Sequence, residues 1–483
     1  MPYSDLGLFA PEIWLCILGL TVLVADLCVS RRNRWLAPGL TAIGLLLCLR
    51  PVLALWGTTP TAEFMGSYSV DHLAVFLKAF ALIAGVMVTL ISTDHLRKSA
   101  GYGEYFSLLV FLVLGLCLLA AANDLILIYL SFELVSLTSY LLVAWRKSDP
   151  KSNEAAVKYF IYGATASAVM LYGLTLVYAA GGSTNVTTLA QRFMQPTADA
   201  GLALVGVLGV VLMVVGLGYK ISMAPFHAWA PDVYEGAPTP VTALLSVGPK
   251  AAGFAVLVRV LFTLSQSLQD APWQVVFAIL AALTMFTGNL LALRQTNVKR
   301  MLAYSSIAHA GYMLIGVVVG PDELWGAAGL LIYLAAYLLM NLGLFAVAIL
   351  LERAAGSSDI DRFAGLARTA PGVAALTILL LLSLTGIPPT AGFLGKLYLF
   401  AAAIKSQQWA WLAVAGIINS VISLYYYMNI ARLMYFDKRE GPEMKLLPGG
   451  VVAVLVVAAA GTLLLFAFPD WLVDAVRHAP IVR

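Results

Sequence analysis

Two stretches of the sequence decide the fold: GLGYKISMAPFHAWAPD at residues 216–232 and LSLTGIPPTAGFLGKLYLF at residues 382–400. Each lies in a long apolar run and contains proline, which cannot donate the backbone hydrogen bond that continues a helix. Each also carries a lysine within seven residues of the proline, Lys220 or Lys396. One membrane proline usually marks a harmless kink. Two broken helices with adjacent lysines, at matching places in two halves, predict instead a membrane transport protein.

The composition predicts an integral membrane protein. Of the 483 residues, 61% are apolar and 11% are charged, whereas an ordinary soluble domain carries about 25% charged residues. Nearly every apolar run reaches the roughly 20 residues that a helix needs to cross a bilayer. The net charge of +4 does not indicate nucleic-acid binding, because the basic residues are spread among short loops.

Fourteen apolar runs are long enough to span a membrane. They are expected near residues 8–29, 36–56, 70–91, 106–121, 125–145, 155–180, 202–229, 241–261, 273–293, 301–319, 325–351, 373–404, 409–433 and 451–468. With fourteen spans, eighteen of the 29 basic residues lie in loops on one side, five lie in loops on the other, and six lie within spans. Because basic loops stay in the cytoplasm, both termini are expected outside it. The first run is followed by Arg31, Arg32 and Arg34, which predicts a retained helix and not a cleaved signal peptide.

The spans divide into two similar sets of five, four to eight and nine to thirteen. Pro225 lies in the fourth member of the first set and Pro389 in the fourth member of the second, while Asn123 and Asn297 precede the two second members. Because five is odd, the second set enters the membrane upside down relative to the first. This is an inverted repeat, which is typical of ion transporters. The expected segments are an N-terminal three-helix segment (1–100), the first repeat (101–265), the inverted second repeat (266–440) and a C-terminal helix with a short tail (441–483).

Four ionisable side chains lie deep within the predicted spans: Glu133, Lys220, Lys250 and Lys396. A charge near the bilayer centre costs at least a few kcal/mol, so it persists mainly where it faces the protein interior and has a partner and a use. Burial favours the neutral amine of a lysine, and a nearby carboxylate favours the ammonium. We expect Glu133 to be the partner of Lys220, so that their approach or separation sets the proton affinity of Lys220. Lys250 then relays to the second repeat, and Lys396 releases or accepts the proton at the far side.

Other polar residues near these lysines are further candidates for the path. His227 and His309 can titrate near neutral pH, although a lone buried histidine is more often structural. Hydroxyl or water links can come from Tyr304, Ser305, Ser306 and Thr390. These hydroxyls can equally serve as hydrogen bonds that hold neighbouring helices together.

Three more basic residues lie within spans. Lys158 and Arg259 are near helix ends, where a long side chain can extend to the interface, or they can take part in the path. Lys78 has no carboxylate nearby in the sequence beyond Asp71, and its role stays open. The four cysteines fall in apolar runs without a C-x-x-C pair and are expected to be membrane-buried hydrophobic side chains; they are Cys16, Cys28, Cys48 and Cys117.

Motifs for energy-supplying cofactors are missing from the sequence. It contains no phosphate-binding P-loop, no dinucleotide fingerprint after a strand and no H-E-x-x-H metal motif. We therefore expect no cofactor and no metal in this chain. The energy for transport is expected to come from a partner or from an ion gradient.

Four stretches carry a resemblance to a known family. KISMAPFHAWAPDVYEGAPTPVTALLSVGPK (220–250) resembles the antiporter-like subunits of respiratory complex I, and is similar to related cation/proton antiporter complexes and membrane hydrogenases. Three further stretches resemble subunit N of NADH–quinone oxidoreductase: KYFIYGATASAVMLYGLTLVY (158–178), SSIAHAGYMLIG (305–316) and GIPPTAGFLGKLYLF (386–400). The likeness covers nearly the whole chain. Lys396 supports the N type, since the similar M subunit carries glutamate at that place.

The resemblance implies an all-α, proton-translocating subunit of a multisubunit enzyme in a bacterial inner membrane. NADH, FMN, iron–sulfur clusters and quinone would bind to other subunits, and an M-type antiporter-like subunit and small membrane subunits would be neighbours. By family match, Glu133, Lys220, Lys250 and Lys396 carry over as channel residues, with His227 and Lys158 as further ones. The alternative is a component of a multi-subunit sodium/proton antiporter.

Overall fold

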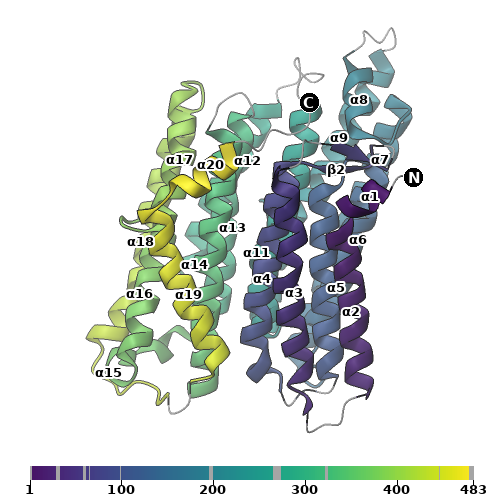
Figure 1. Cartoon of the computed structure of the whole chain (residues 1–483). Helices are drawn as coiled ribbons and strands as arrows, with labels where there is room; N and C mark the ends of the chain where they lie inside the picture. Colours follow the sequence, from purple (N-terminus) through teal and green to yellow (C-terminus); the bar gives the residue numbers. More distant parts are fainter. Residues whose placement is uncertain are drawn as a thin grey trace.

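The computed structural model describes residues 3–28, 33–57, 61–64, 66–97, 99, 101–194, 200–264, 273–320, 325–444 and 447–477. Five basic residues of the loop count lie outside these ranges: Arg31, Arg32, Lys98, Lys445 and Arg483. Within the described ranges the chain is almost entirely helical (Figure 1), with one two-stranded antiparallel sheet.

The N-terminal part consists of three long helices and a short hairpin. Its elements are α1 (Tyr3–Leu8), α2 (Ala10–Cys28), α3 (Leu36–Ala54), the 3-10 helix η2 (Leu55–Gly57), β1 (Thr61–Glu63), β2 (Tyr68–Val70) and α4 (His72–His95). The side chain of Asp71 caps α4 by accepting a hydrogen bond from the backbone N–H of Ala74 at 2.8 Å. Such a cap satisfies one of the free N–H groups at a helix start.

The next part contains the first broken helix. Its elements are α5 (Tyr102–Ala121), α6 (Leu125–Val143), α7 (Pro150–Gly181), α8 (Val186–Phe193), α9 (Ala200–Ile221), α10 (Trp229–Gly236) and α11 (Thr239–Leu264). Asp124 caps α6, and Asp149 caps α7, whose first residue is Pro150. Proline is favoured at a first helical position because its missing N–H has no partner to lose there.

The remaining part contains the second broken helix. Its elements are α12 (Trp273–Ala292), α13 (Val298–Val319), α14 (Gly326–Ala355), η3 (Ile360–Phe363), α15 (Leu366–Thr369), α16 (Pro371–Thr385), α17 (Ala391–Lys405), α18 (Ala410–Phe436), α19 (Gly449–Ala467) and α20 (Asp470–Arg477). The prediction of an all-α membrane protein is confirmed, since thirteen of the described helices are long and apolar enough to cross a bilayer. The α16–α17 pair occupies the place of the expected twelfth span, and the total of fourteen spans stays a prediction.

Both predicted helix breaks are present. Helix α9 ends at Ile221 and α10 begins at Trp229, with Pro225 between them. Helix α16 ends at Thr385, and α17 begins at Ala391 after two prolines. Gly386 closes α16 in the left-handed conformation at φ +89°, which glycine adopts without steric cost. The cis peptide bonds among the described residues are Ala224–Pro225 and Pro388–Pro389.

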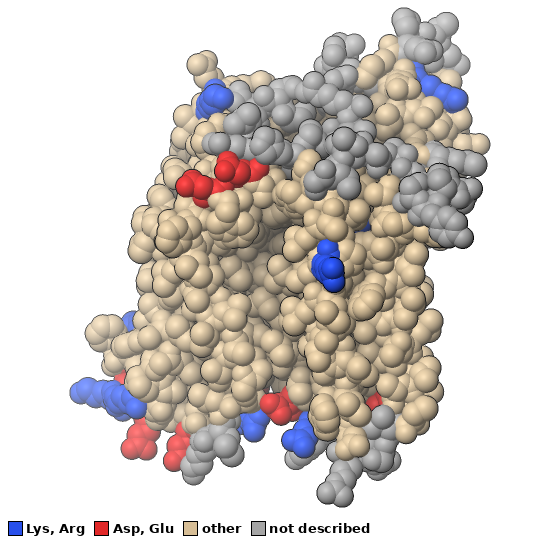
Figure 2. Space-filling view, in the orientation of Figure 1, with Lys and Arg blue, Asp and Glu red and all other residues tan. Residues whose placement is uncertain are grey.

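The two ends of the described chain lie at the same end of the bundle. Figure 1 places α1 and α20 both at its upper end. In the same orientation, Figure 2 shows Lys, Arg, Asp and Glu side chains gathered along the lower edge, while the broad middle of this face is mainly uncharged. This arrangement agrees with the expected even number of spans, which stays a prediction. That the lower end faces the cytoplasm stays a prediction.

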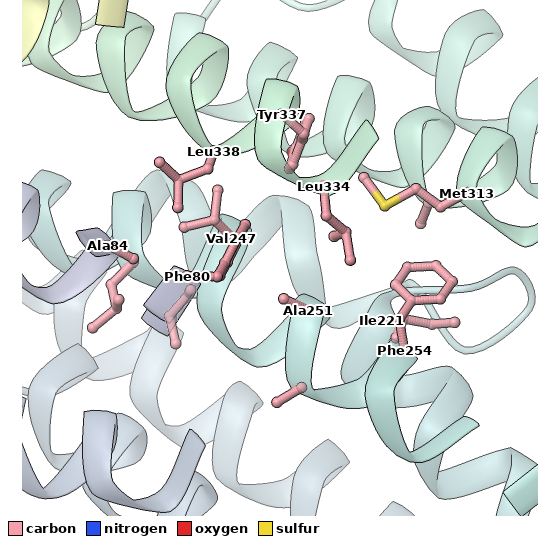
Figure 3. Close-up of a cluster of buried hydrophobic side chains, with 14 of the residues drawn as sticks. Phe80, Ala84, Ile221, Val247, Ala251, Phe254, Met313, Leu334, Tyr337 and Leu338 are labelled. Carbon is pink, nitrogen blue, oxygen red and sulfur yellow. The ribbon is translucent and has the colours of Figure 1, made fainter. Parts of the chain in front are cut away.

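The centre of the molecule is formed by α11, α13 and α14. Every residue in the central apolar window of α11 is buried. Figure 3 shows Val247 of α11 close to Leu338 of α14, with Phe80 of α4 beside them. The helix that carries Lys250 is therefore surrounded by protein on all sides, unlike α7, which leaves side chains such as Tyr172 exposed.

Two isolated β-bridges lie at corresponding places in the two halves. One joins Asp124, before α6, to Asn185, after α7. The other joins Asn297, before α13, to Asp359, after α14. Both bridges therefore tie the start of the second helix of a set to the end of the third. This supports an internal repeat, although the inverted arrangement and the four-segment division remain predictions.

Close packing of α7 on α9 gives a testable consequence. A Cβ atom at Gly173 would lie 2.6 Å from the carbonyl oxygen of Gly209. We expect Gly173→Val to lower the free energy of unfolding by about 1–3 kcal/mol, because overpacking forces helices apart. Thermal inactivation of the membrane-extracted protein measures this. The control is Gly372→Val, since a Cβ at Gly372 meets no atom within 4 Å; equal effects at both sites would contradict the packing explanation.

Candidate functional site

Lys220 lies at the broken end of α9 and faces α6. Its Nζ donates a hydrogen bond to Ser136 Oγ at 2.8 Å and stands 4.3 Å from the centre of the Phe132 ring. The residue is 2% exposed. Its partner in the structure is therefore a neutral hydroxyl, and a cation–π contact adds to the stabilisation of the charged form.

Glu133 lies one helical turn before Ser136 on α6. Its carboxylate is partly buried and accepts a hydrogen bond from Ser167 of α7. Among the described residues no ion pair within 4.0 Å joins Glu133 to Lys220. Glu133 and Ser136 share a face of α6, and Ser136 is the residue that binds the Lys220 amine. Ser136 was missed from the sequence, although its spacing of three from Glu133 places it on the same helix face.

Lys250 lies in the middle of the buried helix α11 and faces α13. Its Nζ donates to the carbonyl oxygen of Ser306 at 2.8 Å and also to Ser306 Oγ. Lys250 is 1% exposed. One turn further along α11 is Gly253, where an added Cβ would lie 3.5 Å from Lys220 Cβ. The backbones that carry Lys220 and Lys250 are thus in close contact.

Helix α13 links Lys250 to the second break. Ser306, His309 and Tyr312 succeed one another at intervals of three residues, so they lie along one face. His309 Nδ1 is hydrogen bonded to the Tyr333 hydroxyl at 2.5 Å, and His309 Nε2 to the Tyr427 hydroxyl at 3.3 Å. Both ring nitrogens therefore have hydroxyl partners that can accept or donate.

Lys396 lies on α17, just after the second break. Its Nζ donates to the carbonyl oxygens of Leu384 at 3.1 Å and Thr385 at 2.8 Å, and to Ser420 Oγ at 3.0 Å. The two carbonyls are those that Pro388 and Pro389 leave without a helical partner. Lys396 Nζ also stands 4.5 Å from the centre of the Tyr312 ring. The broken helix thus provides acceptors for the lysine amine, and the amine provides a donor for the two carbonyl oxygens.

An amide and tyrosine cluster lies beside Lys396 and was not expected from the sequence. Asn289 Nδ2 donates to the Tyr312 hydroxyl at 3.2 Å and to Asn419 Oδ1 at 3.0 Å, and Asn289 Oδ1 accepts from the Tyr426 hydroxyl at 2.9 Å. Asn289 and Asn419 are fully buried. The available sequence signal was asparagine inside apolar spans, which is costly in lipid unless another helix supplies a partner.

The remaining candidates lie at the edges of this row. His227 is half-buried within the first break, and its Nδ1 makes no hydrogen bond among the described residues. Lys158 is 38% exposed and pairs with Asp232 at 2.6 Å and Glu154 at 2.7 Å. Thr390 donates to the carbonyl oxygen of Ile387 inside the second break, and Tyr304 is partly buried. Ser305 Oγ is hydrogen bonded to the Tyr427 hydroxyl at 2.5 Å.

Two buried ion pairs involve residues of the N-terminal part, one within it and one to α11. Lys78 Nζ is 2.9 Å from Glu12 Oε1 and also donates to the Tyr68 hydroxyl. Arg259 donates to both carboxylate oxygens of Asp71, at 2.7 and 3.1 Å. Arg259 is 1% exposed. The expectation that it extends to the interface is therefore wrong, because α11 is enclosed along its whole length.

The three buried lysines differ electrostatically from these ion pairs. Each amine is hydrogen bonded to neutral hydroxyl or carbonyl oxygens. An amine in such a place can exist in either protonation state at moderate cost, whereas an arginine paired to aspartate stays charged. Among the described residues there is no cluster of three His, Cys, Asp or Glu side chains that could hold a metal ion. The site is therefore suited to moving protons between side chains.

Comparison with known proteins identifies the family. The family model for the transmembrane protein of NADH:quinone oxidoreductase and Mrp antiporters matches residues 122–423. NADH-quinone oxidoreductase subunit N 2 of Chloroherpeton thalassium is 42% identical, over 93% of this chain and 90% of that protein. Subunit N of Trichlorobacter lovleyi is 39% identical, over 98% of this chain and 97% of that protein.

A solved structure agrees with these relatives. One chain of respiratory complex I from Thermus thermophilus, determined with bound aureothin, superposes with a TM-score of 0.81 at 32% identity, over 97% of this chain and 100% of that chain. The broken helices and the buried lysines thus stand in a chain whose whole length matches this group. The chain belongs to the NADH:quinone oxidoreductase/Mrp antiporter transmembrane family and, within it, to the family of subunit N of NADH-quinone oxidoreductase.

Proposed function

We propose that this chain is a proton-translocating membrane subunit of an NADH–quinone oxidoreductase. The observation that carries the proposal is the row of three buried amines, those of Lys220, Lys250 and Lys396. Each amine is hydrogen bonded to neutral oxygens, and the chain belongs to the family of subunit N. NADH oxidation and quinone reduction take place on other subunits, which hold the FMN, iron–sulfur clusters and quinone. This chain supplies the path for the protons.

The path begins at Glu133 and Lys220. Glu133 is one helical turn from Ser136, which binds the Lys220 amine, so a small movement of α6 against α9 can bring the carboxylate to the amine or withdraw it. Approach of the carboxylate favours the ammonium form of Lys220, and withdrawal releases the proton. His227 and Lys158 lie beside this end and are secondary candidates, His227 for proton exchange and Lys158 for holding α7 to α10 through Asp232.

The second half of the path runs along α13. Lys250 passes its proton through the Ser306 hydroxyl and water to His309, whose two nitrogens already contact hydroxyl groups. Lys396 exchanges the proton at the second break. Proton transfer requires donor and acceptor within hydrogen-bond reach or joined by one water. The three-residue spacing of Ser306, His309 and Tyr312 provides such steps.

The partners are the other membrane subunits of the complex. They include an M-type antiporter-like subunit and small membrane subunits, packed against the apolar faces that α7, α9 and α18 expose. We place the chain in the bacterial inner membrane with both termini on the periplasmic side, from the distribution of basic loops.

Purification from the native membrane tests this function. Flavin-containing and iron–sulfur subunits are expected to copurify with the chain, and inverted vesicles are expected to take up protons during NADH oxidation. The sodium/proton antiporter is the alternative that the family also contains. Copurification without redox subunits, together with salt-dependent growth of the deletion strain, would favour that alternative. The relatives near 40% identity support the first function.

A further inference from the structure

A polar cavity opens at the end of the bundle where the basic loops lie. Its volume is about 830 Å³, and its lining includes His95, Arg146, Lys299, Glu352 and Asp359. We call this cavity the basic-side vestibule. The candidate path residues named above are absent from its lining in the described part of the chain. The vestibule therefore contains ionisable groups to which the proposed function has given no role.

Glu352, in the last turn of α14, is one of the carboxylates that line the vestibule. Both of its oxygens lie 2.7 Å from Thr239 Oγ1, and Oε1 also accepts from Ser358 Oγ at 2.5 Å. Lys299 Nζ is 3.6 Å away and donates its shorter hydrogen bond, 2.8 Å, to the carbonyl oxygen of Ala237. The Glu352 side chain is 17% exposed. It thus contacts the vestibule on one side and the start of α11 on the other.

The contact with Thr239 places Glu352 at the beginning of the helix that carries Lys250. Eleven residues of α helix separate Thr239 from Lys250, which corresponds to about three turns and roughly 16 Å, so both lie on one face. Ser246 lies on the same face between them. On α14, Asn341 precedes Glu352 by eleven residues and donates to Ser246 Oγ at 2.5 Å. The two antiparallel helices therefore present matching polar stripes to each other.

The inner end of these stripes contains polar atoms without a partner. Asn341 Oδ1 and the Tyr337 hydroxyl are buried and make no hydrogen bond among the described residues. Tyr337 is one turn before Asn341 on α14, and its ring centre lies 5.2 Å from that of His309. Buried polar atoms are nearly always hydrogen bonded to protein or to water. Two such atoms beside the polar row indicate a water-binding site at this place.

We propose that Glu352 loads protons from the basic-side vestibule and that the α11–α14 interface delivers them to Lys250. The proposal rests on the proposed function and adds a second supply of protons, independent of Glu133 and Lys220. In each transfer, the carboxylic acid of Glu352 becomes a carboxylate and the neutral amine of Lys250 becomes an ammonium, with water at Ser246 and Asn341 as the carrier. The vestibule then reprotonates Glu352.

A hydrophobic step separates the two polar ends of this route. Phe345 lies on α14 between Asn341 and Glu352, is fully buried, and has its ring centre 6.4 Å from that of Tyr234. Spacings of four residues from Asn341 and seven from Glu352 place Phe345 on the same face of α14 as both, so the stretch between these two polar residues is apolar in this conformation. Water can bridge this stretch only if α14 shifts relative to α11, the helix that carries Lys250.

A carboxylate with only a structural role has different surroundings from those of Glu352. Asp71 shows what a purely structural carboxylate does in this chain, because its side chain is fully buried and bound twice to Arg259. Glu352 is instead partly exposed, and its cation is 3.6 Å away. The charged or titratable groups that line the vestibule with it are Asp94, His95, Arg97, Arg146, Asp149, Lys151, Glu235, Lys299, Arg353 and Asp359, and of these described residues Lys299 is the one that lies within 4.0 Å of it.

The experiment measures NADH-driven proton uptake and NADH oxidation separately, in inverted vesicles that contain the whole complex. The share of uptake that Lys250→Met abolishes is assigned to this subunit. We expect Glu352→Gln to slow that share about twofold, because the supply from the vestibule is lost while the supply through Glu133 and Lys220 remains. The deficit should grow between about pH 6 and pH 8, as free protons become scarce. Glu352→Asp should restore most of the rate.

Controls separate the possible failures. Asp361→Asn removes an exposed carboxylate nine residues further along and should leave the uptake unchanged. If Glu352→Gln destabilises the complex, Asn341→Leu tests the same route at its inner end without removing a charge, and should slow uptake similarly. Normal uptake in both Glu352→Gln and Asn341→Leu would overturn this inference while leaving the proposed function intact. Normal uptake in Lys250→Met would instead refute the proposed path itself.

Discussion

The Lys250→Met variant is expected to insert and assemble normally and to lose proton transport through this subunit. Methionine has a similar length and suits the apolar surroundings of α11. The atoms that bind the Lys250 amine are the carbonyl oxygen and hydroxyl of Ser306, which are neutral. Removing the amine therefore leaves no unpaired charge in the protein, and the remaining cost is about 1–3 kcal/mol for the buried hydroxyl.

The loss of transport follows from the position of Lys250. Gly253, one turn along the same helix, packs against Lys220, and the Lys250 amine itself binds Ser306, on the α13 face that carries His309 and Tyr312. Without an ionisable group there, we expect transfer between the two breaks to slow about 100-fold or more. Proton uptake by inverted vesicles, related to NADH oxidation, measures this change.

A matched control distinguishes this loss from a general effect of removing a positive charge. Lys147 is exposed in the loop after α6, and Lys147→Met should leave proton uptake unchanged. The amount of assembled complex should be the same in both variants. A Lys250→Met complex that assembles fully and pumps at the normal ratio would show that protons do not pass this residue.

The helix breaks could be predicted from the sequence because proline acts locally. Its missing N–H frees the carbonyl four residues earlier, wherever the segment packs. Pro388 and Pro389 therefore free the carbonyls of Leu384 and Thr385, and in the structure both accept a hydrogen bond from Lys396. Membrane burial of the four charged side chains could be predicted in the same way, from the length of the apolar runs around them.

Partners that are far apart in the chain could not be predicted. Asp71 and Arg259 are separated by 188 residues, and nothing in either segment indicates the other. Lys78 was left without an explanation because Glu12 lies on another helix. The expected approach of Glu133 to Lys220 also depends on how α6 and α9 pack, and here the Lys220 amine binds Ser136 while the Glu133 carboxylate binds Ser167. Helix periodicity gives the face of a residue but not the helix that covers it.

The second large effect is expected at Arg259, and for the opposite reason to Lys250. Arg259→Gln leaves the Asp71 carboxylate buried without its cation, and breaking such a pair on one side costs about 3–5 kcal/mol. Arg259 also donates to the carbonyl oxygen of Ala120 at the end of α5, so three elements lose a common contact. We expect the variant chain to be largely absent from the assembled complex. Immunoblots of membranes and thermal inactivation of the extracted complex measure this.

Removing both charges tests whether the unpaired carboxylate causes the loss. The double variant Asp71→Asn/Arg259→Gln should recover a substantial part of the stability, since a buried pair as a whole contributes little net energy. The exposed pair of Lys151 and Glu235 is the control, and Lys151→Gln should change stability by less than about 1 kcal/mol. An Arg259→Gln chain that assembles normally but fails to pump would mean that Arg259 belongs to the proton path. If the pair is purely structural, less complex should assemble, but the complex that does assemble should pump normally. The reason is that the Asp71–Arg259 contact has no hydrogen-bonded link to the Lys250 side of α11 among the described residues.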